Sequence, residues 1–243
     1  GRESIVSPRK WDAMEIRRID TPWTQVQADW LIVPVVESPE MSGPLADLDR
    51  SLGGIISRLK SLGDLTGKLA STVPLRGVTG IGVSRILFVG LGPAPDLTIA
   101  RLDRALMTAS RSVSDKKEIR VAYAIPAENV GAVSIADFAS SAAMCSIVGS
   151  LGQDIYRSER GRFPFANVQI VTAGTDGGLD AAVDRGRILG QAMNLTRDLI
   201  NRPPQEITPL GFASRAQAVA AECGLRFEVF EKSRLEQERM KSM

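Results

Sequence analysis

The chain has 243 residues, of which 44% are hydrophobic and 24% are charged, and this composition is typical of a folded globular protein rather than a disordered one. Thirty basic and 28 acidic side chains leave a net charge of +2, which is too small to favour DNA or RNA as a partner. Histidine is absent, which excludes Ser-His-Asp catalysis, Cys-His catalysis and histidine-containing zinc sites from these residues.

The two cysteines, Cys145 and Cys223, lie far apart and form no CxxC pair. They therefore predict two buried free thiols rather than a redox or metal motif. The longest uncharged stretch, residues 138–153, is rich in Ser, Ala and Gly and is shorter than the roughly 18 to 20 apolar residues that a spanning helix needs. No signal-like apolar segment lies near residue 1, so we expect a cytoplasmic protein without a membrane partner.

Hydrophobic patterning predicts alternating strands and helices over the first 172 residues. A weak strand signal at 16–19 precedes a strong one at 30–36, where a continuous apolar run indicates burial on both faces and Pro34 limits the ladder. Leucines and isoleucines spaced three and four apart mark one helical face over 45–59. Further strands are expected at 67–74, 85–89, 119–124 and 168–172, and helices at 98–113 and 133–151.

The pattern changes after the glycine-rich segment 174–178. A long helix is predicted over 179–201, ended by Pro203 and Pro204, and Thr208 with Pro209 opens another helix. Residues 225–230 are expected to form a strand, and 231–243 a charged, helix-like tail. One helix, one strand and a tail cannot close a core. We therefore expect one complete α/β domain with helices on both faces of its sheet, followed by a linker helix and an incomplete second domain.

Two glycine-rich segments resemble phosphate-binding loops. Gly90 and Gly92 follow a strand, but a dinucleotide fingerprint would need glycine at position 95, where Pro95 stands, so a strand-to-helix turn is favoured. Residues 63–68, GDLTGK, have three residues between the glycines instead of four, and a leucine rather than Ser or Thr follows the lysine. This segment is therefore not a Walker loop.

Charged residues on the long helix are the remaining site candidates. Asp176, Asp180 and Asp184 recur every four residues and could face a divalent cation, but acidic residues near the start of a helix more often lie in solvent. Four arginines could touch phosphates, or else pair with neighbouring acids or lie at an interface. They are Arg185, Arg187, Arg197 and Arg202. Nothing assembles a nucleophile, a base and an electrophile, so we expect no catalytic, cofactor-binding or metal-binding residue in this chain.

Residues 193–204, MNLTRDLINRPP, with Thr208, Pro209 and Leu210, resemble the leucyl aminopeptidase (cytosol aminopeptidase) family. In that family an N-L-x-R-D-L-x-N-x-P-P stretch links the N-terminal domain to the metallopeptidase domain. Residues 48–54 with 63–68 resemble the family's early helix and following turn, and residues 86–92 resemble its central strand, so the resemblance covers about residues 30–243. Many relatives carry a Y-R-F-D-x-Y-K-S stretch, from which residues 154–165 depart.

The resemblance implies a three-layer, macro-domain-like N-terminal domain with a mixed sheet at 1–176. A linker helix at 177–204 and the truncated start of the metallopeptidase domain at 205–243 would follow. It implies a parent hydrolase of the cytoplasm, often a hexamer, that removes N-terminal residues from peptides. Two divalent ions (zinc, manganese or magnesium) would be held by Lys, Asp and Glu side chains of the second domain, downstream of Met243.

No catalytic residue of the family can therefore be carried over onto this sequence. By itself the chain is expected to be inactive and metal-free, with a role in assembly and in access to the active site. An alternative is a macro-like module that binds a nucleotide or ADP-ribose, supported by Gly90, Gly92 and fold analogy.

Overall fold

The computed structural model describes residues 14–38, 40–152, 158–174 and 178–240. A six-stranded sheet has the order β1-β6-β5-β2-β4-β3; β3 is antiparallel to β4, and the other neighbours are parallel. The sheet is therefore mixed, as predicted. The strands are β1 (Glu15–Asp20), β2 (Trp30–Val36), β3 (Thr72–Arg76), β4 (Arg85–Gly92), β5 (Arg120–Ala124) and β6 (Asn167–Thr172).

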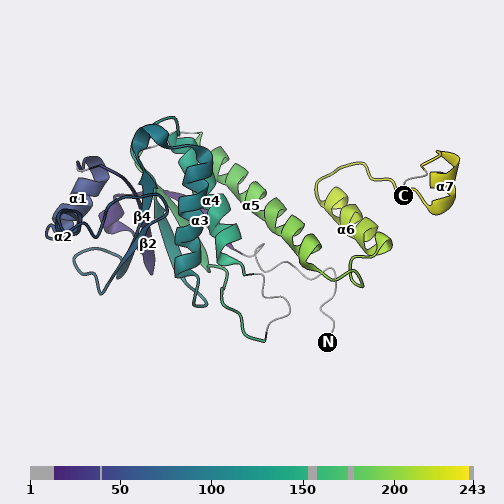
Figure 1. The fold of residues 1–243 in the computed structure, drawn as a ribbon, viewed down its shortest axis with the longest axis horizontal. Helices are drawn as coiled ribbons and strands as arrows, with labels where there is room; N and C mark the ends of the chain where they lie inside the picture. Colours follow the sequence, from purple (N-terminus) through teal and green to yellow (C-terminus); the bar gives the residue numbers. More distant parts are fainter. Residues whose placement is uncertain (1–13, 39, 153–157, 175–177, 241–243) are drawn as a thin grey trace. The chain divides into compact units, whose positions relative to one another are not determined.

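Helices cover both faces of this sheet (Figure 1). The helices of the first part of the chain are η1 (Trp23–Gln25), α1 (Gly43–Ser51), α2 (Ile55–Ser61), η2 (Ala94–Asp96), α3 (Ile99–Val113) and α4 (Ile135–Ser150). They are followed along the chain by α5 (Leu179–Asn201), α6 (Pro209–Glu222) and α7 (Lys232–Gln237). Side chains alternate across the strands: Ile32 of β2 enters a core with α3, α4 and the start of α5, whereas Leu31 enters a second core with η1, α1 and α2. The described residues of this part of the chain thus form the predicted three layers.

Pro34 lies inside β2, a strand with neighbours on both sides. Pairing with β5 ends at Ile32, whereas pairing with β4 continues through Val36 with an irregularity after Val35. The predicted limit on the ladder is confirmed, because proline cannot donate a ladder hydrogen bond.

The single helical face predicted over 45–59 belongs to two helices. Gly53 and Gly54 have φ angles of 65° and 80°, which lie in the left-handed region and end α1. Asp49 of α1 then accepts hydrogen bonds from the amides of Ile56 (2.7 Å) and Ser57 (3.2 Å) in the first turn of α2. The spacing of apolar residues could not reveal this break, because both helices bury their apolar residues in the same core.

The strand predicted over 67–74 begins only at Thr72. Gly67 and Ala70 have φ angles of 76° and 60°, so this segment turns instead of extending. A Cβ atom at Gly67 would lie 2.4 Å from the main-chain oxygen of Val36. The close approach of two backbone segments therefore requires a glycine at this position.

The strand predicted over 225–230 is wrong. Every strand pairing in the described part of the chain lies within residues 15–172, and no strand is assigned to 225–230. An alternating apolar segment becomes a strand only when a neighbour satisfies its backbone. Leu225, Phe227 and Val229 are exposed.

The chain divides into two compact units, Gly1–Leu195 and Thr196–Met243, with the boundary inside α5. In the first unit, Leu179, Ala182 and Val183 of α5 enter the core that also holds α3 and α4. The second unit contains the end of α5 together with α6 and α7.

Candidate functional site

The contact between α4 and α5 depends on small residues. Cβ atoms at Gly186 and Gly190 would lie 2.1 Å from the main-chain oxygen of Ser140 and 3.0 Å from the side chain of Ile147. One turn further, the side-chain amide of Asn194 donates a hydrogen bond of 3.2 Å to the main-chain oxygen of Ile147. Residues at this four-residue spacing lie on one helix face, so α5 packs closely along α4.

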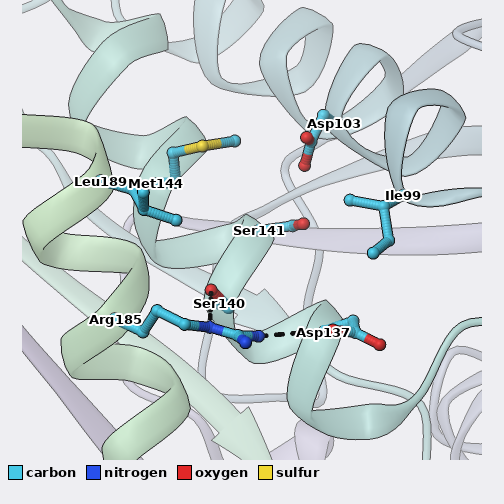
Figure 2. Close-up of a pocket in the computed structure, with 8 residues that line it drawn as sticks. All are labelled: Ile99, Asp103, Asp137, Ser140, Ser141, Met144, Arg185 and Leu189. Atoms are coloured by element: carbon cyan, nitrogen blue, oxygen red, sulfur yellow. Dashed lines mark hydrogen bonds and ion pairs between the residues drawn. The ribbon is translucent and has the colours of Figure 1, made fainter. Parts of the chain in front are cut away.

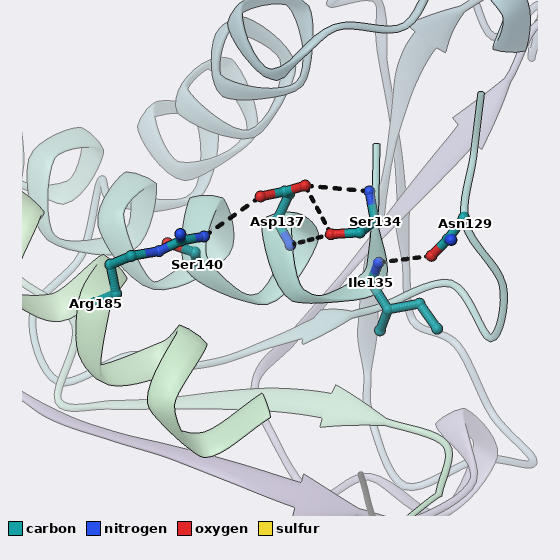
Figure 3. Close-up of polar contacts among 6 residues, drawn as sticks. All are labelled: Asn129, Ser134, Ile135, Asp137, Ser140 and Arg185. Atoms are coloured by element: carbon teal, nitrogen blue, oxygen red, sulfur yellow. Dashed lines mark hydrogen bonds and ion pairs between the residues drawn. The ribbon is translucent and has the colours of Figure 1, made fainter. Parts of the chain in front are cut away.

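The N-terminus of α4 is held by a capping box (Figure 3). The hydroxyl of Ser134 accepts from the amide of Asp137 at 3.1 Å, and Asp137 accepts from the hydroxyl and amide of Ser134. Arg185 of α5 donates to Asp137 at 3.3 Å and to Ser140 at 3.4 Å. The Ser134 hydroxyl, followed by Arg185, holds the pKa of Asp137 below its usual value. The charges of Asp137 and Arg185 therefore compensate each other.

A cavity of about 210 Å³ lies between α3, α4 and α5 (Figure 2). Its lining combines apolar side chains with a few carboxyl, hydroxyl and guanidinium groups, as is usual in binding pockets. The lining residues are Ile99, Asp103, Asp137, Ser140, Ser141, Met144, Arg185 and Leu189.

Asp103 differs from the other polar residues of this cavity. Its Oδ1 atom is buried and has no hydrogen-bond partner among the described residues. Burial raises the pKa of Asp103, although a hydrogen bond from Ser141 opposes this change. A carboxylate oxygen without a partner is costly in a site that excludes water.

This arrangement can bind a ligand, but it does not form a catalytic constellation. The described residues contain no group of three or more Cys, Asp, Glu or His side chains that could hold a metal ion. Sequence reasoning missed Asp103 and Asp137. The S-x-x-D spacing from Ser134 could have indicated the cap at Asp137, and an acid next to the apolar face of the predicted helix 98–113 could have indicated Asp103.

The aspartates predicted to line one face of the long helix have separate partners. Asp180 accepts a hydrogen bond from Arg18 of β1 at 2.7 Å, and this contact lowers the pKa of Asp180. Asp184 pairs with Arg187 at 3.3 Å. Asp176 lies outside the described residues. The side chains of Asp180 and Asp184 are each 66% exposed, in agreement with the expected solvent-facing position.

Three of the four arginines that the sequence singled out have acidic partners, which was one of the expected roles. Arg185 pairs with Asp137, and Arg187 with Asp184. In the second unit, Arg202 contacts Asp198 at 3.1 Å. Arg197 lies on the part of α5 that belongs to the second unit.

Residues of the MNLTRDLINRPP run form a charged cluster in the second unit. Asp198, whose side chain is 11% exposed, accepts hydrogen bonds from Arg202 and from Arg215 of α6. Arg202 also contacts Glu206 at 2.8 Å. Asp198 raises the pKa of Arg202. The cluster connects the end of α5 to α6 across the prolines.

The glycines that resembled phosphate loops are explained by backbone packing. Gly90 and Gly92 lie at the end of β4 rather than in the turn that was predicted, and a Cβ atom at Gly90 would lie 1.9 Å from the main-chain oxygen of Lys68. The amide of Gly92 donates to the main-chain oxygen of Gly67 at 2.8 Å. Residues 63–68 connect α2 to β3, so they do not precede a helix as a Walker loop does.

The prediction for the cysteines is half wrong. Cys145 of α4 is buried in the core that α3 and α4 share, and burial raises the pKa of its thiol. Cys223 is exposed at the end of α6. In the second unit, Ala220 is the only hydrophobic side chain among the described residues that is fully buried. This unit has too little core to cover Cys223.

Among the described residues, no helix is long and apolar enough to span a membrane. Residues 32–160 match the sequence profile of the cytosol aminopeptidase family, N-terminal domain. A probable cytosol aminopeptidase of Solibacter usitatus is 32% identical over 95% of this chain and 45% of its own length. One from Ralstonia pickettii is 28% identical over 86% of this chain and 43% of its own length.

Two solved structures are also similar. A mutant of tomato leucine aminopeptidase has a TM-score of 0.73 at 25% identity, covering 86% of this chain and 42% of that protein. The bottromycin maturation enzyme in complex with Mn has a TM-score of 0.65 at 25% identity, covering 86% of this chain and 40% of that protein. The chain thus spans less than half the length of these relatives.

Proposed function

The chain belongs to the cytosol aminopeptidase family, and we propose that it is the non-catalytic N-terminal portion of a peptidase that removes N-terminal amino acids from peptides. The observation that carries this proposal is the match of residues 32–160 to the family's N-terminal domain.

The domain organisation that we propose has three parts. Residues 1–176 form the N-terminal domain, 177–204 a linker helix, and 205–243 the start of the catalytic domain. Two sets of contacts support this proposal. Gly186 and Gly190 pack the first part of the linker helix on α4. Within the second unit, the ion pairs of Asp198 with Arg202 and Arg215 join the end of that helix to α6.

Two divalent metal ions would polarise the peptide bond in the whole protein. The described residues do not fit such ions, because no three potential ligands come together and Asp137 already pairs with Arg185. We therefore assign the metal site to the catalytic domain, and to this portion a role in assembly, as a hexamer, and in access to the active site. We expect the whole protein in the cytoplasm.

The test compares the purified 243-residue chain with the product of the complete gene, each supplied with manganese and leucine amide. We expect hydrolysis by the complete product and none by the chain. A chelator should abolish the activity of the complete product. Hydrolysis by the 243-residue chain at a comparable rate would contradict the proposal.

A further inference from the structure

The cavity between α3, α4 and α5 has one uncompensated charge on its wall. Arg185 is neutralised by Asp137. Asp103 has a buried oxygen without a hydrogen-bond partner among the described residues. Within the same residues, no cation lowers its pKa. The net charge that the cavity presents is therefore negative and belongs to Asp103.

The uncharged part of the wall combines three apolar side chains with the hydroxyl groups of Ser140 and Ser141. Ile99 of α3, Met144 of α4 and Leu189 of α5 line the cavity, and Figure 2 shows Met144 and Leu189 close together, with Ile99 on the opposite side. Ile99 and Leu189 are 51% and 46% exposed, so these side chains lie where the cavity opens to solvent. A ligand in this cavity meets apolar side chains together with the carboxyl group of Asp103.

We propose that this cavity binds a small organic cation, namely a primary ammonium or guanidinium group on a short aliphatic chain. The cationic group pairs with the carboxylate of Asp103. An ammonium or guanidinium group only donates hydrogen bonds and a carboxylate only accepts them, so the two groups are complementary. The methylene groups lie against Ile99, Met144 and Leu189. A volume of about 210 Å³ is below the range of about 300–1,000 Å³ typical of drug-sized ligands, so only one short chain fits.

Other ligand classes fit less well. A divalent metal needs several oxygen ligands, whereas Asp103 is the single unpaired carboxylate among the described lining residues. An anion would be repelled by Asp103, and the attraction of Arg185 for it is offset by the charge of Asp137. A neutral apolar ligand would leave the charge of Asp103 without a counter-charge.

The test is an NMR titration of the full 243-residue chain, labelled at Ile, Leu and Met methyl groups, with n-butylammonium chloride at constant ionic strength. Saturable shifts are expected at Ile99, Met144 and Leu189. Uncharged 1-butanol should bind about tenfold more weakly or worse, since the charged hydrogen bond is lost. This comparison needs no variant. Equal binding of both compounds, or no saturable shift at millimolar ligand, would overturn the proposal.

A matched pair of variants localises the binding. D103N should weaken n-butylammonium binding about tenfold or more, whereas D184N, which removes an exposed carboxylate on α5, should leave it unchanged. Unchanged binding in D103N would also overturn the proposal. N-acetyl-lysinamide distinguishes two sources of the cation: binding as tight as that of n-butylammonium supports a lysine side chain of another protein, and exclusion of the larger compound supports a free amine.

Discussion

Gly186 of α5 approaches the main-chain oxygen of Ser140 on α4 so closely that a Cβ atom at position 186 would lie 2.1 Å from it. Two helices come this near only where one of them lacks a side chain. The same contact brings Arg185, the residue before Gly186, to Asp137 and to the cavity wall. The position of the candidate site thus depends on one missing methyl group.

Substitution of Gly186 by alanine should destabilise the first unit. Alanine is better than glycine in a helix by about 1 kcal/mol, but the new methyl group meets backbone that cannot rotate away. Overpacking of this kind costs about 1–3 kcal/mol, so we expect a net loss. Urea unfolding followed by tryptophan fluorescence measures the change.

Gly190 provides the internal comparison for this substitution. A Cβ atom there would lie 3.0 Å from the side chain of Ile147 and 3.2 Å from the main-chain oxygen of Met144. These contacts are less close than the 2.1 Å at position 186, so G190A should cost less than G186A. D184A, an exposed change on the same helix, should alter stability by less than about 0.5 kcal/mol. If G186A were as stable as the original protein, the close contact of position 186 with the main chain of Ser140 would be contradicted.

Removal of the Asp49 carboxylate should loosen α2. Asp49 accepts from the amides of Ile56 and Ser57, and loss of such a cap costs about 1–2 kcal/mol. D49A should therefore lower the free energy of unfolding by that amount, and D49N, which keeps one acceptor oxygen, by less. D47A, at an exposed ion pair with Arg50, is the control. If D49A and D47A lowered the free energy of unfolding equally, the hydrogen bonds from the first turn of α2 to Asp49 would not contribute as proposed.

The Asp103 carboxylate should reduce stability at neutral pH. Burial raises its pKa in the folded state, so ionisation of Asp103 is less favourable in the folded protein than in the unfolded chain. This difference lowers the free energy of unfolding as the pH rises above the unfolded-state pKa of an aspartate, about 3.9. Well below that pH the carboxyl group is protonated in both states, and the destabilisation is absent. We expect D103N to be more stable than the original protein by about 1 kcal/mol at pH 7.

The difference between D103N and the original protein should shrink as the pH falls toward 3. Chemical denaturation of both proteins across this range provides the measurement, with D184N as a control for the loss of an exposed carboxylate. A D103N protein that is less stable at pH 7 would mean that the carboxylate has a cation partner after all. Such a result would also weaken the proposed ligand site.

Loss of the Asp198 charge should release α6 from the end of α5. Asp198 bonds to Arg202 and to Arg215, and a hydrogen bond to a charged group contributes about 1.5–3 kcal/mol. In D198N, amide hydrogens of α6 should exchange at least about tenfold faster. E238Q, at the exposed pair with Arg234, should leave α6 unchanged. Unaltered hydrogen exchange of α6 in D198N would show that Asp198 does not stabilise the contact between α6 and the end of α5.

Much of the fold could be predicted because local patterns determine it. The continuous apolar run at 30–36 forms β2, and α5 covers the predicted 179–201. The break at Gly53 and Gly54 was missed because apolar spacing continues across it. The strand at 225–230 was wrong because pairing depends on a neighbour that the described residues do not supply.

The candidate site was less accessible from the sequence. Asp103, Asp137 and Arg185 are separated by 34 and 48 residues, and only the packing of α3, α4 and α5 brings them to one cavity. The burial of Asp103 depends on how closely α4 approaches, which is a three-dimensional property. By contrast, the ion pairs of Arg187 and Arg202 are local and were foreseen.

The most direct test of the family assignment is to read the encoding gene beyond the codon for Met243. We expect an open frame that supplies the remaining half or more of the relatives' length, with Lys, Asp and Glu residues able to hold two metal ions. A stop codon directly after Met243 would contradict the claim that this chain is the N-terminal portion of a peptidase.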